Sequence, residues 1–157
     1  MNTALLFSNR LLNVSILSWI IAQFLKTVID FKKHKKFNRQ RLAGAGGMPS
    51  SHAAVTTSLV FTSYFIHGFG SSIFAVSFIL ALIVMYDATG VRWSAGLHAQ
   101  AINKIVDHLG NPDKKHELQK MIPTLNESIG HRVIEVICGA LLGASIAGIA
   151  EILVRTR

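Results

Sequence analysis

Acidic residues and cysteine are scarce in this chain of 157 residues, and so are charged residues of either sign. The sequence has 8 aspartates and glutamates against 16 lysines and arginines, and charged residues make up only 15% of it. Half of the residues are hydrophobic and the mean hydropathy is +0.42. This composition is too apolar for an ordinary soluble domain. The sequence therefore predicts an integral membrane protein with a single domain over residues 1–157.

Two other shortages exclude further classes of protein. Cys138 is the only cysteine and lies in an apolar segment, which excludes a disulfide framework and a thiolate metal site. We interpret it as a small buried hydrophobe. The net charge of +8 would suggest nucleic-acid binding in a soluble protein, but the basic residues lie mainly between apolar runs and not among stacking aromatics. We therefore expect no nucleic-acid partner.

What the chain does have is long apolar runs. Four of them are candidate membrane spans: Leu11–Ile29, Ala53–Phe69, Ser71–Met85 with a continuation to Ala88, and Val133–Val154. The last has about the 20 residues that a bilayer core requires. Apart from Arg10, the basic residues around the first run follow it, so this run is predicted to be a retained anchor and not a cleaved signal.

The polar stretch between the third and fourth runs differs in character. Apolar residues recur there at helical spacing from Trp93 to Leu109, which predicts an amphipathic helix packed on the bundle or on the lipid surface. A second polar helix is expected from Lys114 to about Met121. The predicted fold class is all-α: a bundle of about four transmembrane helices plus one or two amphipathic cytoplasmic helices.

Basic residues are distributed unequally between the two sides that four alternating spans define. Three of them fall on one side, namely Arg10, Arg155 and Arg157. The other side holds Lys26, the six basic residues from Lys32 to Arg41, Arg92, Lys104, Lys114, Lys115, Lys120 and Arg132. The positive-inside rule places this crowded side in the cytoplasm. We therefore expect a multi-pass membrane protein whose polar motifs face the cytoplasm.

Small residues mark the fourth run, where Gly139 and Gly143 stand in GxxxG spacing. Such a stripe allows two helices to approach closely. Two uses stay open: a homo-oligomer formed through this helix, and packing against another helix of the same chain.

The segment from Gly46 to His52 combines two glycines, a proline, two hydroxyls and an imidazole just before an apolar run. Glycine permits close backbone approaches, and proline suits the first turn of a helix. The free N–H groups of a helix start favour anions, and the hydroxyls of Ser50 and Ser51 add donors there. The segment is predicted to be a phosphate-binding loop that enters a helix, with His52 placed to transfer a proton.

His131 and Glu135 form the second polar motif, at the start of the fourth apolar run. If both lie in one helix they share a face, with Cβ atoms roughly 5–6 Å apart. A carboxylate so placed can orient an imidazole that acts as nucleophile or base. The alternative is an ion pair without chemistry, although an ionisable residue inside a membrane span is a functional candidate.

Together these motifs resemble those of the type-2 phosphatidic acid phosphatase and vanadium haloperoxidase superfamily. The run PSSH at 49–52 is similar to its PSGH motif, and His131-x-x-x-Glu135 is similar to the end of its SRxxxxxHxxxD motif. The runs GGMPSSHAA and YDATGVR, with a Gly-His before the last apolar helix, more closely resemble a divergent branch of small membrane proteins. The resemblance extends from about Ala22 to the end of the chain.

The resemblance implies a role for each matching residue. His131 would be the nucleophile that forms a phosphohistidine, Glu135 its orienting acid, and His52 the general acid. The Ser50 and Ser51 region would donate to phosphate, and Gly47 is a supporting residue of the site. No metal and no cofactor are implied.

The cations that bind phosphoryl oxygens in the superfamily are not matched. Its SR pair would fall at Thr124 and Leu125, and its KxxxxxxRP motif has only an echo in Lys32 and Arg39. The best substitutes are Lys26 and Arg92. Alternatives stay open for both residues: Lys26 could extend to the lipid headgroups, and Arg92 could pair with Asp87, which would then support the site. Asn103 and Glu127 are interpreted as solvated surface residues.

These interpretations lead to two hypotheses of different kinds. The first is a membrane phosphatase that hydrolyses a phosphomonoester or pyrophosphate, on a lipid such as a phosphatidate or polyprenyl phosphate, at the cytoplasmic face. The second is a non-catalytic membrane protein that binds a phosphorylated lipid or a partner protein. The missing arginine favours the second, and the two histidines favour the first.

Overall fold

The computed structural model describes residues 8–35, 46–109 and 123–156, and all regular structure in these ranges is helical. The helices are α2 (Arg10–His34), α4 (Ser51–His67), α5 (Ser72–Thr89), α6 (Val91–Leu109) and α8 (Val133–Arg155). The all-α prediction is confirmed. The four apolar runs correspond to α2, α4, α5 and α8, although α2 extends beyond its run at both ends.

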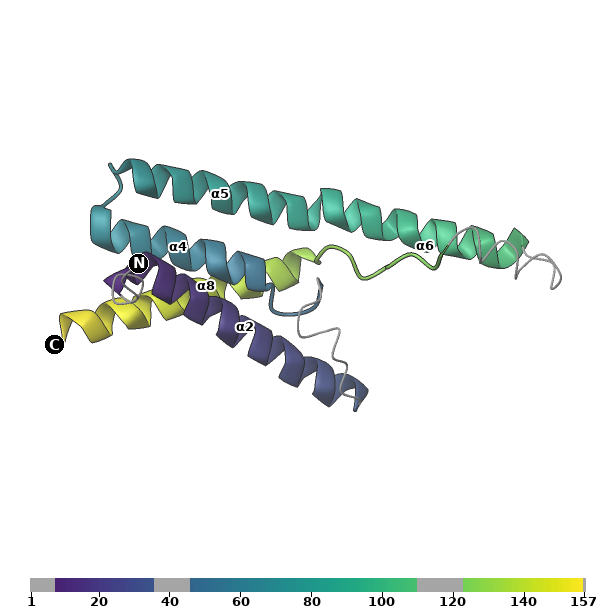
Figure 1. The fold of residues 1–157 in the computed structure, drawn as a ribbon, viewed down its shortest axis with the longest axis horizontal. Coiled ribbons are helices and arrows are strands. Elements are labelled where there is room, and N and C mark those ends of the chain that lie inside the picture. The colour runs from purple at the N-terminus through teal and green to yellow at the C-terminus, as the bar shows by residue number, and fades with distance from the viewer. Residues whose placement is uncertain (1–7, 36–45, 110–122, 157) are drawn as a thin grey trace, which may run out of the picture.

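Helix α4 is the centre of the bundle, with α2, α5 and α8 packed around it (Figure 1). Along the chain the direction alternates, so the ends of α2 and α5 and the starts of α4 and α8 lie at one end of the bundle. The start of α2 and the end of α8 lie at the other. The motifs that flank these helices therefore meet at one end, as alternating spans predict, and we call it the site end.

Close contact between α4 and α8 explains the two glycines in GxxxG spacing. A Cβ added at Gly139 would lie 2.2 Å from the carbonyl oxygen of Ser50, and one added at Gly143 would lie 2.2 Å from that of Ala54. Only glycine allows the two backbones to approach this closely. The face that contains both glycines is therefore occupied by α4 of the same chain, and any oligomer would have to use another face.

Three helical stretches of the described chain are long and apolar enough to cross a bilayer: Arg10–Lys33, Ser72–His108 and Val133–Arg155. Helix α4, with 17 residues, lies among them and buries hydroxyls that include Ser58, Thr62 and Ser63. Several of its hydroxyls donate to carbonyl oxygens one turn earlier, such as Ser58 to Val55 at 2.8 Å. This local pairing satisfies several polar groups that would be costly in an apolar interior, whereas the buried hydroxyls of Thr57 and Thr62 have no hydrogen-bond partner among the described residues.

Helix α6 continues almost in line with α5 and leaves the bundle (Figure 1). The two form a stretch of 37 residues, which at 1.5 Å per residue is about 55 Å long, against roughly 30 Å for a bilayer core. Among the described helices, α6 packs only against α5. Of the two predicted locations of this amphipathic helix, packing on the bundle is therefore not the one observed, because the chain does not fold back at Gly90. Packing on the lipid surface stays a prediction. The second polar helix expected at 114–121 lies outside the described residues.

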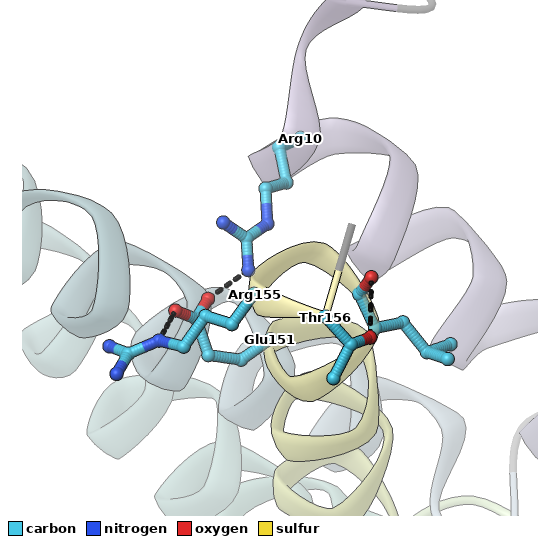
Figure 2. A network of polar contacts seen from close by, with 5 residues as sticks. Arg10, Glu151, Arg155 and Thr156 are labelled. Atoms are coloured by element: carbon cyan, nitrogen blue, oxygen red, sulfur yellow. Dashed lines mark hydrogen bonds and ion pairs between the residues drawn. The ribbon is translucent and has the colours of Figure 1, made fainter.

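The end of the bundle opposite the site holds an ion-pair cluster (Figure 2). The buried carboxylate of Glu151 accepts from Arg10 of α2 and, at 2.7 Å, from Nε of Arg155 one turn further along α8. Because Arg10 comes from a different helix, this cluster joins the two ends of the chain. We call it the far-end cluster.

Candidate functional site

Backbone hydrogen bonds join the three segments of the site end. The N–H of Ser50, before α4, donates to the carbonyl oxygen of Glu135 in the first turn of α8 at 3.0 Å. The N–H of His131 donates to the carbonyl oxygen of Ala88 near the end of α5, also at 3.0 Å. His52 and His131 are therefore brought to the same end of the bundle by the backbone itself, as the sequence predicted.

Two glycines allow the loops at this end to pack on one another. Gly46 has φ +83° and Gly130 has φ +90°, a region that side chains rarely adopt. A Cβ at Gly46 would lie 2.8 Å from the carbonyl oxygen of Ser128, and one at Gly130 would lie 2.5 Å from the N atom of Trp93. The loop before α4 thus packs on the loop before α8, which packs on the start of α6.

Helix α4 begins at Ser51, with Ser50 as its N-cap. The Ser50 hydroxyl accepts from the N–H of Ala53 at 3.4 Å, and both serines are buried. Pro49 precedes the cap, so the expectation that it occupies the first helical turn is wrong. Gly47 has φ +87° and lies in the wall of the adjoining pocket. The predicted phosphate-binding hydroxyls therefore lie at a helix start, where one of them caps the helix.

His131 is the most unusual side chain of the site. Its relative exposure is 4%, and within the described part of the chain neither ring nitrogen has a hydrogen-bond partner. Buried polar atoms in proteins are nearly always paired, and an unpaired one calls for an explanation. Both nitrogens of this ring therefore have unused capacity to donate or accept a hydrogen bond.

Charged groups surround this ring. Desolvation by burial lowers the pKa of His131; Glu135 raises it, while Lys26, His52 and Arg92 lower it through their charges. His131 is therefore held in its neutral form, the form in which an imidazole nitrogen can act as a nucleophile.

The pKa of His52 is lowered by desolvation and by the same two cations, Arg92 and Lys26. Its side chain is exposed, but the surrounding protein still desolvates the ring and lowers its pKa, and the charges of Arg92 and Lys26 lower the pKa further. The charge of Asp87 acts in the opposite direction. Both histidines therefore lie in the field of the same two cations.

Glu135 does not hydrogen bond with the ring of His131. One of its carboxylate oxygens accepts instead from the backbone N–H of Arg132 at 2.9 Å, as in a capping box at the start of α8. The helix begins at Val133, so His131 precedes it and the geometry assumed for a helical pair at 131 and 135 is wrong. In this structure Glu135 acts on His131 through charge and not through a hydrogen bond.

The two cations are held in different ways. Lys26 is only 3% exposed, and its Nζ donates to Gln23 at 3.2 Å, so its side chain does not extend to the exposed surface. Arg92, in the first turn of α6, forms an ion pair with Asp87 of α5 at 2.5 Å. The pairing left open by the sequence is therefore present, and Arg92 still acts on both histidines.

A pocket of about 490 Å³ adjoins this group on the side of α2. Its wall includes Lys26, Gly47 and Glu135 from the predicted site. It also includes residues that the sequence analysis did not assign to the site, among them Lys33, Arg132 and Glu127. Lys33 lies seven positions after Lys26, a spacing that places both on one helix face and could have indicated it. His52 and His131 are not among the residues that line the pocket.

This arrangement suits an anion, because a neutral imidazole, a second imidazole and two cations share one region. Among the described residues, no group of three or more His, Cys, Asp or Glu side chains could hold a metal ion. Cys138 is only half-buried, in α8, and lies outside this group.

Comparison with known proteins agrees with these motifs. The model of the family described as "Divergent PAP2 family" matches residues 7–146. An uncharacterized membrane protein of Bacillus subtilis (strain 168), YuiD, is 41% identical over 145 residues, which cover 88% of this chain and 91% of that protein. No solved structure matches the chain. The chain is a membrane protein that belongs to the divergent PAP2 family.

Proposed function

We propose that this protein is an integral membrane phosphatase that hydrolyses a phosphomonoester or pyrophosphate, on a lipid such as a phosphatidate or polyprenyl phosphate. The observation that carries the proposal is the buried ring of His131, with both nitrogens unpaired, in the field of Lys26, Arg92 and His52. Phosphoryl transfer depends mainly on positioning and on stabilising charge. Such a group of side chains can supply both.

In this proposal a neutral nitrogen of His131 attacks phosphorus. A bond between nitrogen and phosphorus forms, and the bond from phosphorus to the leaving oxygen breaks. His52 gives its proton to that oxygen, so the product leaves as an alcohol or as phosphate. Water then attacks the phosphohistidine, with His52 accepting its proton, and inorganic phosphate is released while His131 is regenerated.

Lys26 and Arg92 stabilise the charge on the equatorial phosphoryl oxygens. They also lower the pKa of His52 in the empty site. A bound phosphate dianion offsets this effect because its negative charge favours the protonated imidazole. Substrate binding thus favours the protonated form of His52 that this step requires.

The proposed lipid substrate rests on location. Lys26 belongs to a stretch long and apolar enough to span a bilayer, Arg10–Lys33, and lies toward its end. The site would lie at the level of the lipid headgroups, on the side that carries most of the basic residues. The positive-inside rule makes this the cytoplasmic leaflet.

Phosphate release by the purified protein in vesicles tests the proposal. With no added metal, the protein should release inorganic phosphate from phosphatidate or polyprenyl phosphate, and vanadate, which mimics the phosphoryl group, should inhibit it. The variants His131→Ala and His52→Ala should each lose this activity. Full activity in both variants would contradict the mechanism.

A second candidate function is binding without turnover. It is favoured by the position of Glu135, whose carboxylate bonds the Arg132 N–H and leaves the His131 ring without an orienting partner. In that case lipid phosphate would bind in competition with vanadate, and no substrate in the panel would release phosphate. The same vesicle assay, combined with a binding measurement, separates the two functions.

A further inference from the structure

The segment from Leu125 to Gly130 lies between α6 and the site. It leads directly to His131, and in Figure 1 it runs beside α6 to the start of α8. It contains no helix or strand, so its course is determined by what it contacts. We call it the lead segment. The position of the His131 backbone depends on where this segment is held.

Asn103 holds the beginning of the lead segment. Its Nδ2 donates to the carbonyl oxygen of Leu125 at 3.0 Å, and its Oδ1 accepts from the N–H of the same residue at 3.0 Å. Nδ2 also donates to the carboxylate of Glu127 at 2.8 Å. The prediction that Asn103 and Glu127 are simply solvated is therefore wrong, since both are used to fix the chain.

Backbone contacts with α6 hold the rest of the lead segment. A Cβ at Gly96 would lie 2.6 Å from the carbonyl oxygen of Ile129 and 3.2 Å from that of Glu127. Further along, Gly130 fits against the backbone of Arg92 and Trp93. On α6, Asn103, Gly96 and Arg92 are separated by roughly one or two helical turns, so they lie close to one face. The lead segment therefore packs along one face of α6 from its first residue to its last.

We propose that α6 is the positioning element for His131, and that Asn103 and Gly96 are positioning residues that act through the lead segment. Neither touches the reacting atoms. Their effect on turnover rests on the proposed function, whereas their effect on the position of His131 does not. The proposal gives a role to a helix that packs against no described helix except α5.

The accessibility of His131 to diethyl pyrocarbonate, which acylates neutral imidazole, directly tests whether α6 positions His131. His131 is buried and His52 is exposed, so in the wild-type protein His52 should react quickly and His131 slowly. In Asn103→Leu and in Gly96→Ala the lead segment should separate from α6. Labelling of His131 should then be several times faster, measured by mass spectrometry of peptides, with His52 unchanged.

Matched variants separate positioning from general loss of structure. Lys104→Ala, on the exposed surface next to Asn103, should leave both labelling rates unchanged. Asn103→Asp places a carboxylate beside Glu127 and should speed labelling of His131. Adding Glu127→Gln restores a donor opposite that carboxylate and should return the rate toward the wild-type value. If Asn103→Leu does not fold, this pair of variants gives the same test.

Unchanged labelling of His131 in folded Asn103→Leu and Gly96→Ala would overturn the proposal. Faster labelling of both histidines together, with an earlier thermal transition, would also overturn it, because the residues would then simply stabilise the bundle. If the protein is a phosphatase, both variants should lower kcat about 10- to 100-fold with little change in KM. If no phosphate is released by any form, the labelling result still decides the role of α6.

Discussion

Both ends of the helix bundle contain buried ionisable groups, but the buried carboxylate at one end is paired and the buried imidazole at the other is not. In the far-end cluster the Glu151 carboxylate contacts two arginines, so its charge is balanced within the chain (Figure 2). At the site end the two nitrogens of His131 are buried and unpaired among the described residues, and the nearest charges include two cations. The Glu151 carboxylate thus has partners within the chain, although Nε of Arg10 is buried and unpaired, whereas the His131 ring has no hydrogen-bond partner among the described residues.

We interpret the paired Glu151 as a structural group and the unpaired His131 as a functional one. A buried group that is paired contributes to a defined fold, whereas one that is kept unpaired carries a cost that a ligand can relieve. The two faces of α8 also differ in packing. Gly139 is in tight contact with α4, whereas Gly148, on the opposite face of the helix, would accept a Cβ with nothing within 4 Å.

The largest expected effect is at His131. In His131→Asn, phosphate release should fall at least about 10³-fold, because the nucleophile is lost. The melting temperature should change little, since the His131 ring makes no hydrogen bond on which the fold depends. Initial rates and a thermal melt of the same sample measure both. A parallel loss of activity and stability would mean that His131 is structural, like Glu151.

The next effect concerns the contact between α4 and α8. In Gly139→Ala the new methyl group would overlap the Ser50 carbonyl oxygen and force the start of α4 away, destabilising the protein by about 1–3 kcal/mol. Gly148→Ala is the matched control, and it should stabilise α8 by roughly 0.5–1 kcal/mol because alanine favours a helix. Denaturation in detergent compares the two. Equal effects would contradict the packing difference between the two faces of α8.

Breaking the far-end cluster should affect stability and spare the site. In Glu151→Gln the guanidinium of Arg10 loses its charged partner, so the melting temperature should fall. Arg155→Ala should have a smaller effect because the Arg155 side chain is 72% exposed. In both variants vanadate should bind with unchanged affinity at temperatures where the protein is folded. A loss of vanadate binding would show that the two ends are coupled.

The smallest expected effect is the pH dependence of stability. The folded protein lowers the pKa of His52 and His131 below the ordinary value of about 6.5. Above that pH both histidines are neutral in the folded and in the unfolded protein. As the pH falls through 6.5 the unfolded chain takes up protons first, so the free energy of unfolding decreases until the folded-state pKa values are reached. The melting temperature should therefore fall below pH 6.5, and less so in His131→Asn.

Much of the site could be predicted from the sequence, because apolar runs and charge distribution determine which motifs share an end. His52, His131, Lys26 and Arg92 were placed together by this reasoning, and Arg92 pairs with Asp87, which was one of the alternatives. The four apolar runs correspond to α2, α4, α5 and α8, and their alternating directions alone determine which motifs share an end, whatever the detailed packing of the helices.

What the sequence could not provide depends on irregular backbone. The lead segment has no periodic pattern, so its contacts with Asn103 and Gly96 were not predictable. The Glu135 carboxylate was assigned to the wrong partner because helix α8 begins after His131. The far-end cluster was missed for another reason. Arg10 and Glu151 are 141 positions apart, although a carboxylate inside an apolar run should itself have indicated a partner.

Trapping of a phosphoryl group on His131 tests the central claim most directly. The protein in vesicles would be mixed with lipid phosphate labelled in the phosphoryl group and quenched in alkali, where phosphohistidine is stable, and the peptides would be analysed by mass spectrometry. The account predicts a phosphoryl group on the peptide that contains His131 in the wild type and none in His131→Asn. Phosphate release by the wild type with no label on His131 at any time would contradict it.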